Sequence, residues 1–352
     1  MLRDFSKEAL HTFAHLMPKA TLHVHLEGSI LPATIIKLAQ KNKVSVPFSN
    51  DVEFRNCFHN VSFEGFIALY EKIIKCLKMP DDYELVAYEF GKKSARQNIY
   101  YSEVTFSIAT NSILTGLDWR TILLALNKGR ARAQKEFGIT WSWIFDLTLE
   151  RCFEPETFVA MLIQARCQGL GVIAMGLSDT IVTAKFPEYQ PILDKALAAG
   201  LPVIPHAGEF EGADNVHKAL DACKAVRIDH GVRCIEDPSL VRKLVQERIP
   251  LDVCITSNVR LGVFPSYQHH PIRTLWDAGV IITLGADDPS LFGTDLNQEY
   301  DHLIDDYHFT ADELERVSLN GVKASLLSQI EKEALMKKFT SKFAELRAKI
   351  LE

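Results

Sequence analysis

Eight short apolar stretches, each followed by a segment of helical periodicity, most constrain the fold of this 352-residue chain. The apolar stretches have the length and content of buried strands. Strands that alternate with helices form parallel βαβ units, and eight such units close a barrel. The predicted strands cover residues 19–27, 99–107, 139–146, 171–177, 201–206, 226–230, 250–256 and 280–286.

The segments between these strands carry apolar residues at helical spacing. Helices are expected over 1–16, 32–41, 58–78, 83–97, 119–137, 155–167, 189–199, 215–223, 238–247 and 272–277, and further helices over 296–352 should cap the structure. A doubly wound open sheet is the alternative, but neither Gly-rich nucleotide-binding loop occurs in the chain. We therefore predict an α/β fold, a (β/α)₈ TIM barrel with extra C-terminal helices, in one domain over residues 1–352.

Composition excludes several kinds of partner and compartment. The net charge of −6 and the absence of a long basic run argue against nucleic acid as the main partner. The seven cysteines form no C-x-x-C pair, which indicates free thiols in a reducing compartment. The N-terminus lacks the apolar core of a signal peptide, and no apolar run approaches the ~18 residues that span a bilayer. We expect a cytoplasmic protein with no membrane partner; the oligomeric state is not predicted.

Polar residues follow several of the predicted strands. In a barrel of this kind the C-terminal strand ends carry the active residues, so these side chains should converge on one mouth. Each one alone has a plain explanation, because a strand-end Asp is commonly a helix cap and a lone His is commonly a hydrogen-bonded structural residue. The strand-end residues are His23, His25, Glu27, His206, Glu209, Asp229, His230, Asp287 and Asp288.

Two histidines in this set are spaced for metal binding. His23 and His25 are two residues apart, so on a strand both imidazoles face the same side. The alternative is a pair of buried histidines whose ring nitrogens are hydrogen bonded. With His206 and Asp287 they form a donor set that suits one Zn²⁺ ion and leaves a position for water. Such an ion lowers the pKa of its water from ~15.7 to near 7.

The remaining strand-end groups suit acid–base chemistry beside that ion. Glu209 follows His206 by three residues, so it can lie near the metal without binding it and hand a proton to a substrate. His230 can orient or deprotonate the water, and Asp288 can share a proton with a ring nitrogen of the substrate. A second metal is not expected, because residues 171–179 contain no lysine to bridge two ions.

Five short motifs, taken together, resemble the adenosine deaminase family of metal-dependent hydrolases. They occur in the order HVHLEGS (23–29), HAGE (206–209), DHG (229–231), TSN (256–258) and ADDP (286–289). The similarity runs from about Pro18 to Tyr300 and into the C-terminal helices. It implies a (β/α)₈ barrel, one zinc ion and hydrolytic deamination of a 6-aminopurine nucleoside, most simply adenosine to inosine and ammonia.

The resemblance also implies roles for individual residues. It implies zinc ligation by His23, His25, His206 and Asp287. Glu209 would protonate N1 of the purine, His230 would act as the water-activating base, and Asp288 would hold N7. Helix 58–78 would provide an apolar gate over the ribose through Phe63, Phe66, Ile67 and Tyr70, although these residues could equally be ordinary helix core. The residues expected to contact substrate are His25, Glu27, Asp179, Asp288, Phe63 and Phe66.

The chain departs from the family pattern on the sugar side. Where animal adenosine deaminases have Asp, this chain has Glu27, as in adenine deaminases and many bacterial relatives. Asp179 stands where a Gly is usual near the end of strand four. Residues 103–108 read EVTFSI in place of a Glu-Val-Arg-x-Ser-Pro pattern. The segments 261–264 (LGVF) and 288–295 (DPSLFGTD) look more like nucleoside deaminases than adenine deaminases.

Several functions remain open at this stage. A 5′-substituted adenosine such as aminodeoxyfutalosine, or free adenine, could replace adenosine as substrate. A barrel metallohydrolase acting on an ester or amide is less favoured, because Glu209 and Asp288 suit a ring-nitrogen substrate. A catalytically silent binding protein would have lost a ligand or the acid, and none is lost here. Cytidine-type zinc deaminases, which pair H-x-E with P-C-x-x-C, are excluded, because P-C-x-x-C is absent.

Overall fold

The computed structural model describes residues 5–59, 61, 63–148, 152–178 and 186–351. In this part of the chain eight parallel strands follow one another in sequence order, each paired with the next. This order confirms the predicted (β/α)₈ barrel. The strands are β1 (Lys19–Thr21), β2 (Ile99–Phe106), β3 (Thr140–Leu147), β4 (Val172–Leu177), β5 (Val203–Ala207), β6 (Ile228–His230), β7 (Leu251–Val253) and β8 (Ile282–Leu284).

The barrel closes just beyond the ends of β8 and β1. Val24 forms a parallel bridge with Asp287. The His25 amide donates to the Asp287 carbonyl at 2.8 Å, and the Asp287 amide donates to the His23 carbonyl at 3.3 Å. The contact that closes the barrel therefore also joins the two segments that carry the predicted metal ligands.

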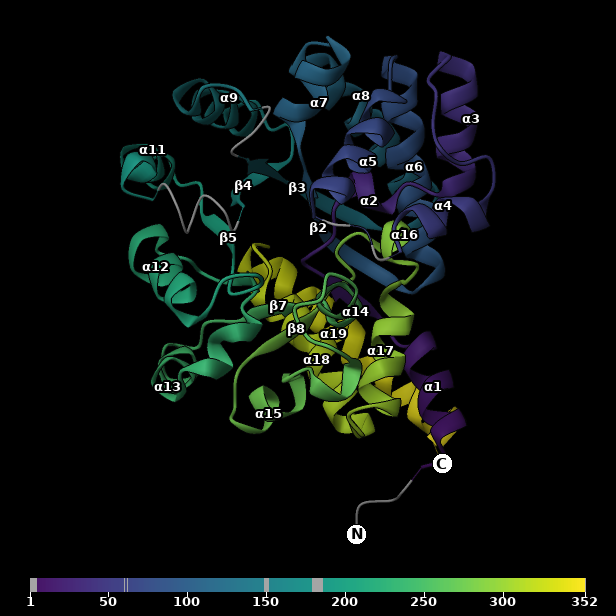
Figure 1. Ribbon diagram of the computed structural model, residues 1–352. Helices are drawn as coiled ribbons and strands as arrows, with labels where there is room; N and C mark the ends of the chain where they lie inside the picture. Colours follow the sequence, from purple (N-terminus) through teal and green to yellow (C-terminus); the bar gives the residue numbers. More distant parts are fainter. Residues whose placement is uncertain (1–4, 60, 62, 149–151, 179–185, 352) are drawn as a thin grey trace.

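Helices surround the strands (Figure 1). Four of them, α8 (Trp119–Phe137), α9 (Pro155–Cys167), α13 (Pro238–Glu247) and α15 (Ile272–Asp277), have the predicted bounds. Local signals explain part of this agreement, because proline occupies the first turn of α9 and α13 and the Asp237 carboxylate caps α13. The other predicted helices are confirmed with small shifts as α3 (Pro32–Asn42), α6 (Pro80–Arg96), α11 (Phe186–Ala198) and α12 (Ala213–Cys223). The helix predicted over 1–16 begins later, as α1 (Lys7–Leu16), and residues 1–4 of that prediction lie outside the described residues.

Several predicted elements are longer than the observed ones, including the strands predicted over 226–230 and 280–286, which are observed as β6 and β8. The first strand ends at Thr21, and Glu27 lies instead in the one-turn helix α2 (Leu26–Ser29). The strand predicted over 250–256 is β7, and its last residues belong to α14 (Ile255–Arg260). The helix predicted over 58–78 is α5 (Phe63–Lys75). A short apolar run does not show where pairing stops, because that depends on the neighbouring strand.

Three further helices were not predicted: α4 (Asp51–Cys57), α7 (Ile108–Thr115) and α16 (Pro289–Phe292). Two of them follow the C-terminal ends of strands β2 and β8 directly and so border the mouth of the barrel. They are short, so their periodicity is weak in the sequence. None of the helices in the described ranges is long and apolar enough to cross a membrane.

The C-terminal helices are α17 (Leu296–Asp305), α18 (Ala311–Ala324) and α19 (Gln329–Leu346). They do more than cap the barrel, because α18 lies directly against β8 and β1. Ser318 donates to the Pro18 carbonyl at 2.7 Å, and a Cβ on Gly321 would lie 2.8 Å from the Ala20 carbonyl oxygen. α19 lies beside α1, where the Phe13 and Phe343 rings are 6.5 Å apart (Figure 1). The last segment thus completes the outer ring.

Candidate active site

Four predicted metal ligands meet at the mouth of the barrel. His23 and His25 follow β1, His206 lies on β5 and Asp287 follows β8. All four side chains are buried or nearly so. Asp287 has a left-handed backbone with φ 56°, a conformation that non-glycine residues rarely adopt and that is concentrated at functional sites.

The spacing of these ligand atoms fits one bound ion. Nε2 of His25 lies 3.3 Å from Nε2 of His206 and 3.3 Å from Oδ1 of Asp287. Nε2 of His23 lies 3.5 Å from the same oxygen. Tetrahedral ligands bound at 2.0–2.2 Å are about 3.4 Å apart. Three of the six distances between the four ligands are therefore already the edge lengths of a zinc coordination shell.

The protonation of two of the three histidines agrees with this arrangement; although burial lowers the pKa of His23, its neighbours Cys254, Asp229 and Asp287 raise it overall. Burial lowers the pKa of His25 to about 4 and lowers that of His206 well below its ordinary value. Both rings are therefore uncharged at neutral pH and offer a lone pair. The buried His23 Nε2 accepts or donates no hydrogen bond among the described residues. Uncharged imidazoles facing one carboxylate are the ligands that Zn²⁺ prefers.

Two carboxylates that the prediction did not assign lie behind the histidines. Asp229 on β6 places its oxygens 3.7 Å from Nδ1 of His23 and 3.6 Å from Nδ1 of His206. Asp146 on β3 lies 3.9 Å from Nδ1 of His25. Carboxylates in this position orient metal-binding imidazoles. Each is the second-last residue of its strand, and that was the sequence signal available for finding them.

Replacing Asp229 by asparagine is expected to weaken metal binding about 10- to 100-fold, because a group behind the ligands contributes that much to affinity. The exchange keeps the size of the side chain and removes its charge. Metal retained against increasing chelator concentrations measures the effect. Asp237→Asn is the matched control, because Asp237 pairs with His217 on the surface. Equal retention in both variants would mean that Asp229 does not support the ligands.

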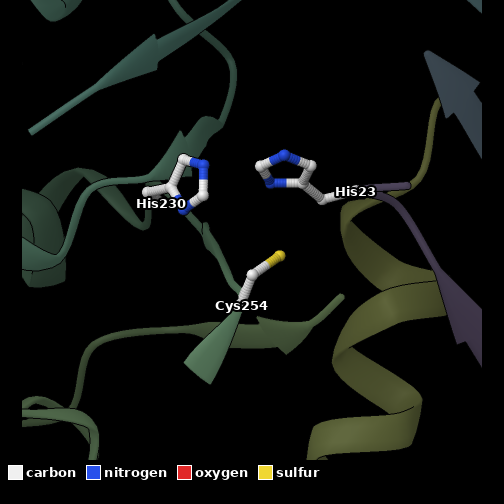
Figure 2. A group of neighbouring side chains, drawn as sticks. All are labelled: His23, His230 and Cys254. Atoms are coloured by element: carbon white, nitrogen blue, oxygen red, sulfur yellow. The ribbon is translucent and has the colours of Figure 1, made fainter. Parts of the chain in front are cut away.

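A thiol also faces this centre. Figure 2 shows Cys254, at the end of β7, pointing toward the rings of His23 and His230, and the three ligand atoms lie within 4.8 Å of one another. Burial raises the pKa of the Cys254 thiol, which favours the uncharged form. The thiolate is the form that binds metal, so Cys254 is better suited to packing behind His23 than to ligation.

Glu209 and His230 stand together beside the ligands. Nε2 of His230 lies 3.4 Å from Oε1 of Glu209 and 3.9 Å from Oδ2 of Asp287. Both side chains are buried. The turn before Glu209 requires glycine, since Gly208 has φ 64° and a Cβ there would lie 2.4 Å from Val216. The sequence prediction that these two groups flank the metal position agrees with the geometry.

Asp288 lies on the other side of the mouth, against α2. A Cβ on Gly28 would lie 1.8 Å from Oδ1 of Asp288, so glycine is needed for this close approach. Burial, with added repulsion from the Asp287 and Glu27 carboxylates, raises the pKa of Asp288 well above its usual range. Oδ1 is buried without a hydrogen-bond partner among the described residues.

Glu27 is held by the unpredicted helix α7 and the residue before it. Its Oε1 accepts hydrogen bonds from the Ser107 amide at 3.0 Å and from the Asn111 side chain at 2.7 Å. Oε2 has no partner of good geometry in the described chain, although the Tyr70 hydroxyl favours the charged form. Burial nevertheless raises the pKa of Glu27 to about 7. One oxygen is thus fixed and the other is left for a further partner.

The structure describes some residues of the predicted apolar gate and not others. Phe66 on α5 stacks on Phe292 of α16, with ring centroids 5.6 Å apart, and is buried. Ile67 is 36% exposed. The side chain of Phe63, and all of Asp179, lie outside the residues that the structure describes, so these two predictions are not tested.

A second histidine cluster joins α1 to α17, outside the mouth. Asp301 accepts from Nδ1 of His11 at 2.5 Å and from Nε2 of His15 at 2.8 Å, while Nε2 of His11 lies 3.3 Å from Asp305. The two contacts with Asp301 are hydrogen-bond distances, shorter than the spacing of metal ligands. Although burial lowers the pKa of His11, the hydrogen bonds and charges of Asp301 and Asp305 raise it overall. The cluster is therefore an ion pair of a protonated histidine.

This ion pair predicts a pH-dependent contribution to stability. Because the folded pKa of His11 is raised, the stabilisation is fully present below the unfolded value of about 6.5 and is lost as the pH rises through the folded pKa. His11→Gln should therefore lower the Tm at pH 6 more than at pH 8. His59→Gln, at an exposed histidine, is the control. An equal loss at both pH values would contradict the assignment.

Comparisons with known proteins agree with this geometry. The family model described as adenosine deaminase matches residues 18–342. An aminodeoxyfutalosine deaminase of Streptomyces avermitilis is 36% identical over 83% of this chain and 81% of its own length. An adenine deaminase of Crocosphaera subtropica is 32% identical over 93% of this chain and 99% of its own.

A solved structure gives the same result for the fold. The crystal structure of an adenine deaminase from Arthrobacter aurescens has a TM-score of 0.85 and 26% identity, and it covers 92% of this chain and 98% of its own. The residues matched by the family model, 18–342, include all eight strands and every strand-end residue described above. The chain therefore belongs to the adenosine deaminase family of hydrolytic deaminases.

Proposed function

We propose that this chain hydrolytically removes the 6-amino group of an adenine-containing nucleoside, with one zinc ion as cofactor. The observation that carries the proposal is the convergence of three imidazoles and Asp287 at 3.3–3.5 Å spacing, beside the carboxyl groups of Glu209 and Asp288. Hydrolysis of an ester or amide requires no carboxyl group that contacts a ring nitrogen. A purine offers ring nitrogens to both Glu209 and Asp288.

The site residues fall into metal ligands and groups that act on the substrate. His23, His25, His206 and Asp287 would hold the zinc ion, which supplies an activated water at neutral pH when bound. The other groups act on the substrate and are named by their atoms.

Glu209 is placed to hand a proton to ring nitrogen N1, because it borders the ligands without being one of them. Asp288, across the mouth, is placed to contact N7. His230, 3.4 Å from Glu209, is placed to orient the attacking water. Phe66 and its partner Phe292 close one side of the mouth against bulk water.

The preferred purine is proposed from the relatives and from Glu27. Adenosine is the simplest substrate that the motifs predict. Relatives named aminodeoxyfutalosine deaminase, at 36% and 35% identity, make a 5′-substituted adenosine the first candidate. Relatives named adenine deaminase make free adenine the second. Glu27 favours a nucleoside, because its open oxygen Oε2 can accept a hydrogen bond from a sugar hydroxyl.

Comparison of kcat/KM for aminodeoxyfutalosine, 5′-methylthioadenosine, adenosine and adenine tests the proposal. We expect the best nucleoside to exceed adenine by about 5- to 150-fold, since an unpaired buried acceptor costs roughly 1–3 kcal/mol. Glu27→Ala should reduce this preference more than Glu27→Gln, which keeps an acceptor. Free adenine as the best substrate would make the chain an adenine deaminase. No ammonia release from any of the four by the zinc-loaded protein would contradict the proposal.

A further inference from the structure

A buried polar chain runs from His230 away from the mouth of the barrel. The Ile272 amide lies 3.3 Å from Nδ1 of His270, and Nε2 of His270 lies 3.1 Å from Oδ1 of Asn258. Nδ2 of Asn258 lies 3.1 Å from Nδ1 of His230. Asn258 is fully buried, and His270 and His230 are 4% and 1% exposed. No other predicted role accounts for Asn258 or His270.

The direction of these hydrogen bonds is fixed at the Ile272 end. A backbone amide can only donate, so Nδ1 of His270 accepts and carries no proton. Burial lowers the pKa of His270 to about 3, with a smaller effect from His302, so the ring is uncharged and its one proton is on Nε2. That N–H donates to the Asn258 carbonyl oxygen.

The hydrogen bond from Asn258 also determines which ring nitrogen of His230 carries the proton. With its oxygen accepting from His270, Asn258 turns its NH₂ group toward His230, and an NH₂ group can only donate. Nδ1 of His230 must then be the bare nitrogen, and the uncharged ring carries its proton on Nε2. The reverse direction would set two N–H groups against each other at Ile272. A buried donor without an acceptor is unfavourable, because it has lost its hydrogen bonds to water and gained none in the protein.

We propose that Asn258 and His270 are positioning residues that hold His230 in the Nε2–H tautomer, so that His230 enters the deamination as a hydrogen-bond donor and not as a base. This inference rests on the proposed function for its catalytic meaning. In this tautomer the nitrogen that faces Glu209, at 3.4 Å, has no lone pair to accept a proton from water. Its N–H can instead orient an oxygen in the mouth. This replaces the base role that the family resemblance implied for His230.

The tautomer can be measured without substrate. Nitrogen-15 NMR of the zinc-loaded protein with labelled histidine distinguishes a protonated from a bare ring nitrogen, and loss of signals in His230→Gln assigns them. We expect a protonated Nε2 and a bare Nδ1 on His230. A bare Nε2 and a protonated Nδ1 on His230 in the wild-type protein would overturn this proposal. The substrate panel tests the proposed function separately, so failure of the one is distinguishable from failure of the other.

Asn258→Asp tests whether Asn258 sets the tautomer of His230. Aspartate keeps the size of the side chain but offers only acceptors, so His230 should shift to the Nδ1–H tautomer. kcat should fall by about 10²–10³-fold, the usual loss when one preorganised hydrogen-bond donor is removed, with little change in KM. A shifted tautomer with unchanged kcat would overturn the catalytic part of the proposal.

His270→Phe and a control variant complete the set. His270→Phe removes the donor to Asn258, so we expect the His230 spectrum to show a mixture of tautomers. The control is His269→Gln, the exposed neighbour that bonds to Ser266. It should leave the spectrum and kcat unchanged. A wild-type spectrum in His270→Phe would show that His270 does not set the tautomer, and Tm and zinc content confirm that each variant is folded.

Discussion

Glu209→Gln is expected to lower kcat by about 10²–10⁴-fold, the range contributed by a general acid. Glutamine keeps the shape of the side chain and removes its ionisable proton. The zinc content should stay near one ion per chain, because the spacing that fits a metal involves His23, His25, His206 and Asp287 and not Glu209. KM should change much less than kcat, since the proton is needed in the transition state.

Elemental analysis and steady-state kinetics on one preparation make this measurement. Glu211→Gln, two residues along at an exposed position, is the matched control and should retain full activity. Loss of zinc from Glu209→Gln would show that Glu209 is a ligand. An unchanged kcat would remove it from the mechanism.

Arg227→Met is expected to destabilise the fold by about 3–5 kcal/mol. Arg227 is completely buried in the barrel interior and pairs with Glu103 on β2 and, through Nε at 2.5 Å, with Asp252 on β7. Glu103 also accepts from Tyr101 at 3.1 Å. Removing the guanidinium leaves two buried carboxylates without a counter-charge, and this costs far more than the packing that methionine keeps.

Denaturant unfolding with zinc present measures this loss. Arg233→Met is the control, because Arg233 forms a surface pair with Glu236 whose loss should cost no more than about 1 kcal/mol. Adding Glu103→Gln and Asp252→Asn to Arg227→Met should restore part of the stability by removing the unpaired charges. A single Arg227→Met variant as stable as the Arg233→Met control would contradict the argument.

The sequence determined much of the architecture because its signals are local. Strand and helix periodicity, together with proline and aspartate at helix starts, predicted eight βα units and the bounds of four helices. The rule that active residues lie at C-terminal strand ends then selected His23, His25, His206, Asp287, Glu209 and His230 from the twelve histidines and forty-five acidic residues of the chain.

The features of the site that the sequence did not predict also have physical reasons. Glu27 was expected at a strand end but lies in α2, because its carboxylate bonds to Ser107 and Asn111, eighty or more residues away. The roles of Asp146 and Asp229 also escaped prediction. Their sequence signal is a single polar residue near the end of a strand, which a helix cap gives as well.

The sequence by itself therefore determined the barrel, the family and the set of chemical groups at its mouth. Only the tertiary structure decided how these groups act on one another. The ligand spacing arises where β1 and β8 close the barrel through Val24 and Asp287, and the direction of the hydrogen bonds behind His230 is set by the Ile272 amide. The ligand spacing depends on contacts between segments far apart in the chain, and the hydrogen-bond direction depends on single donors and acceptors. The periodicity of the sequence carries information about neither.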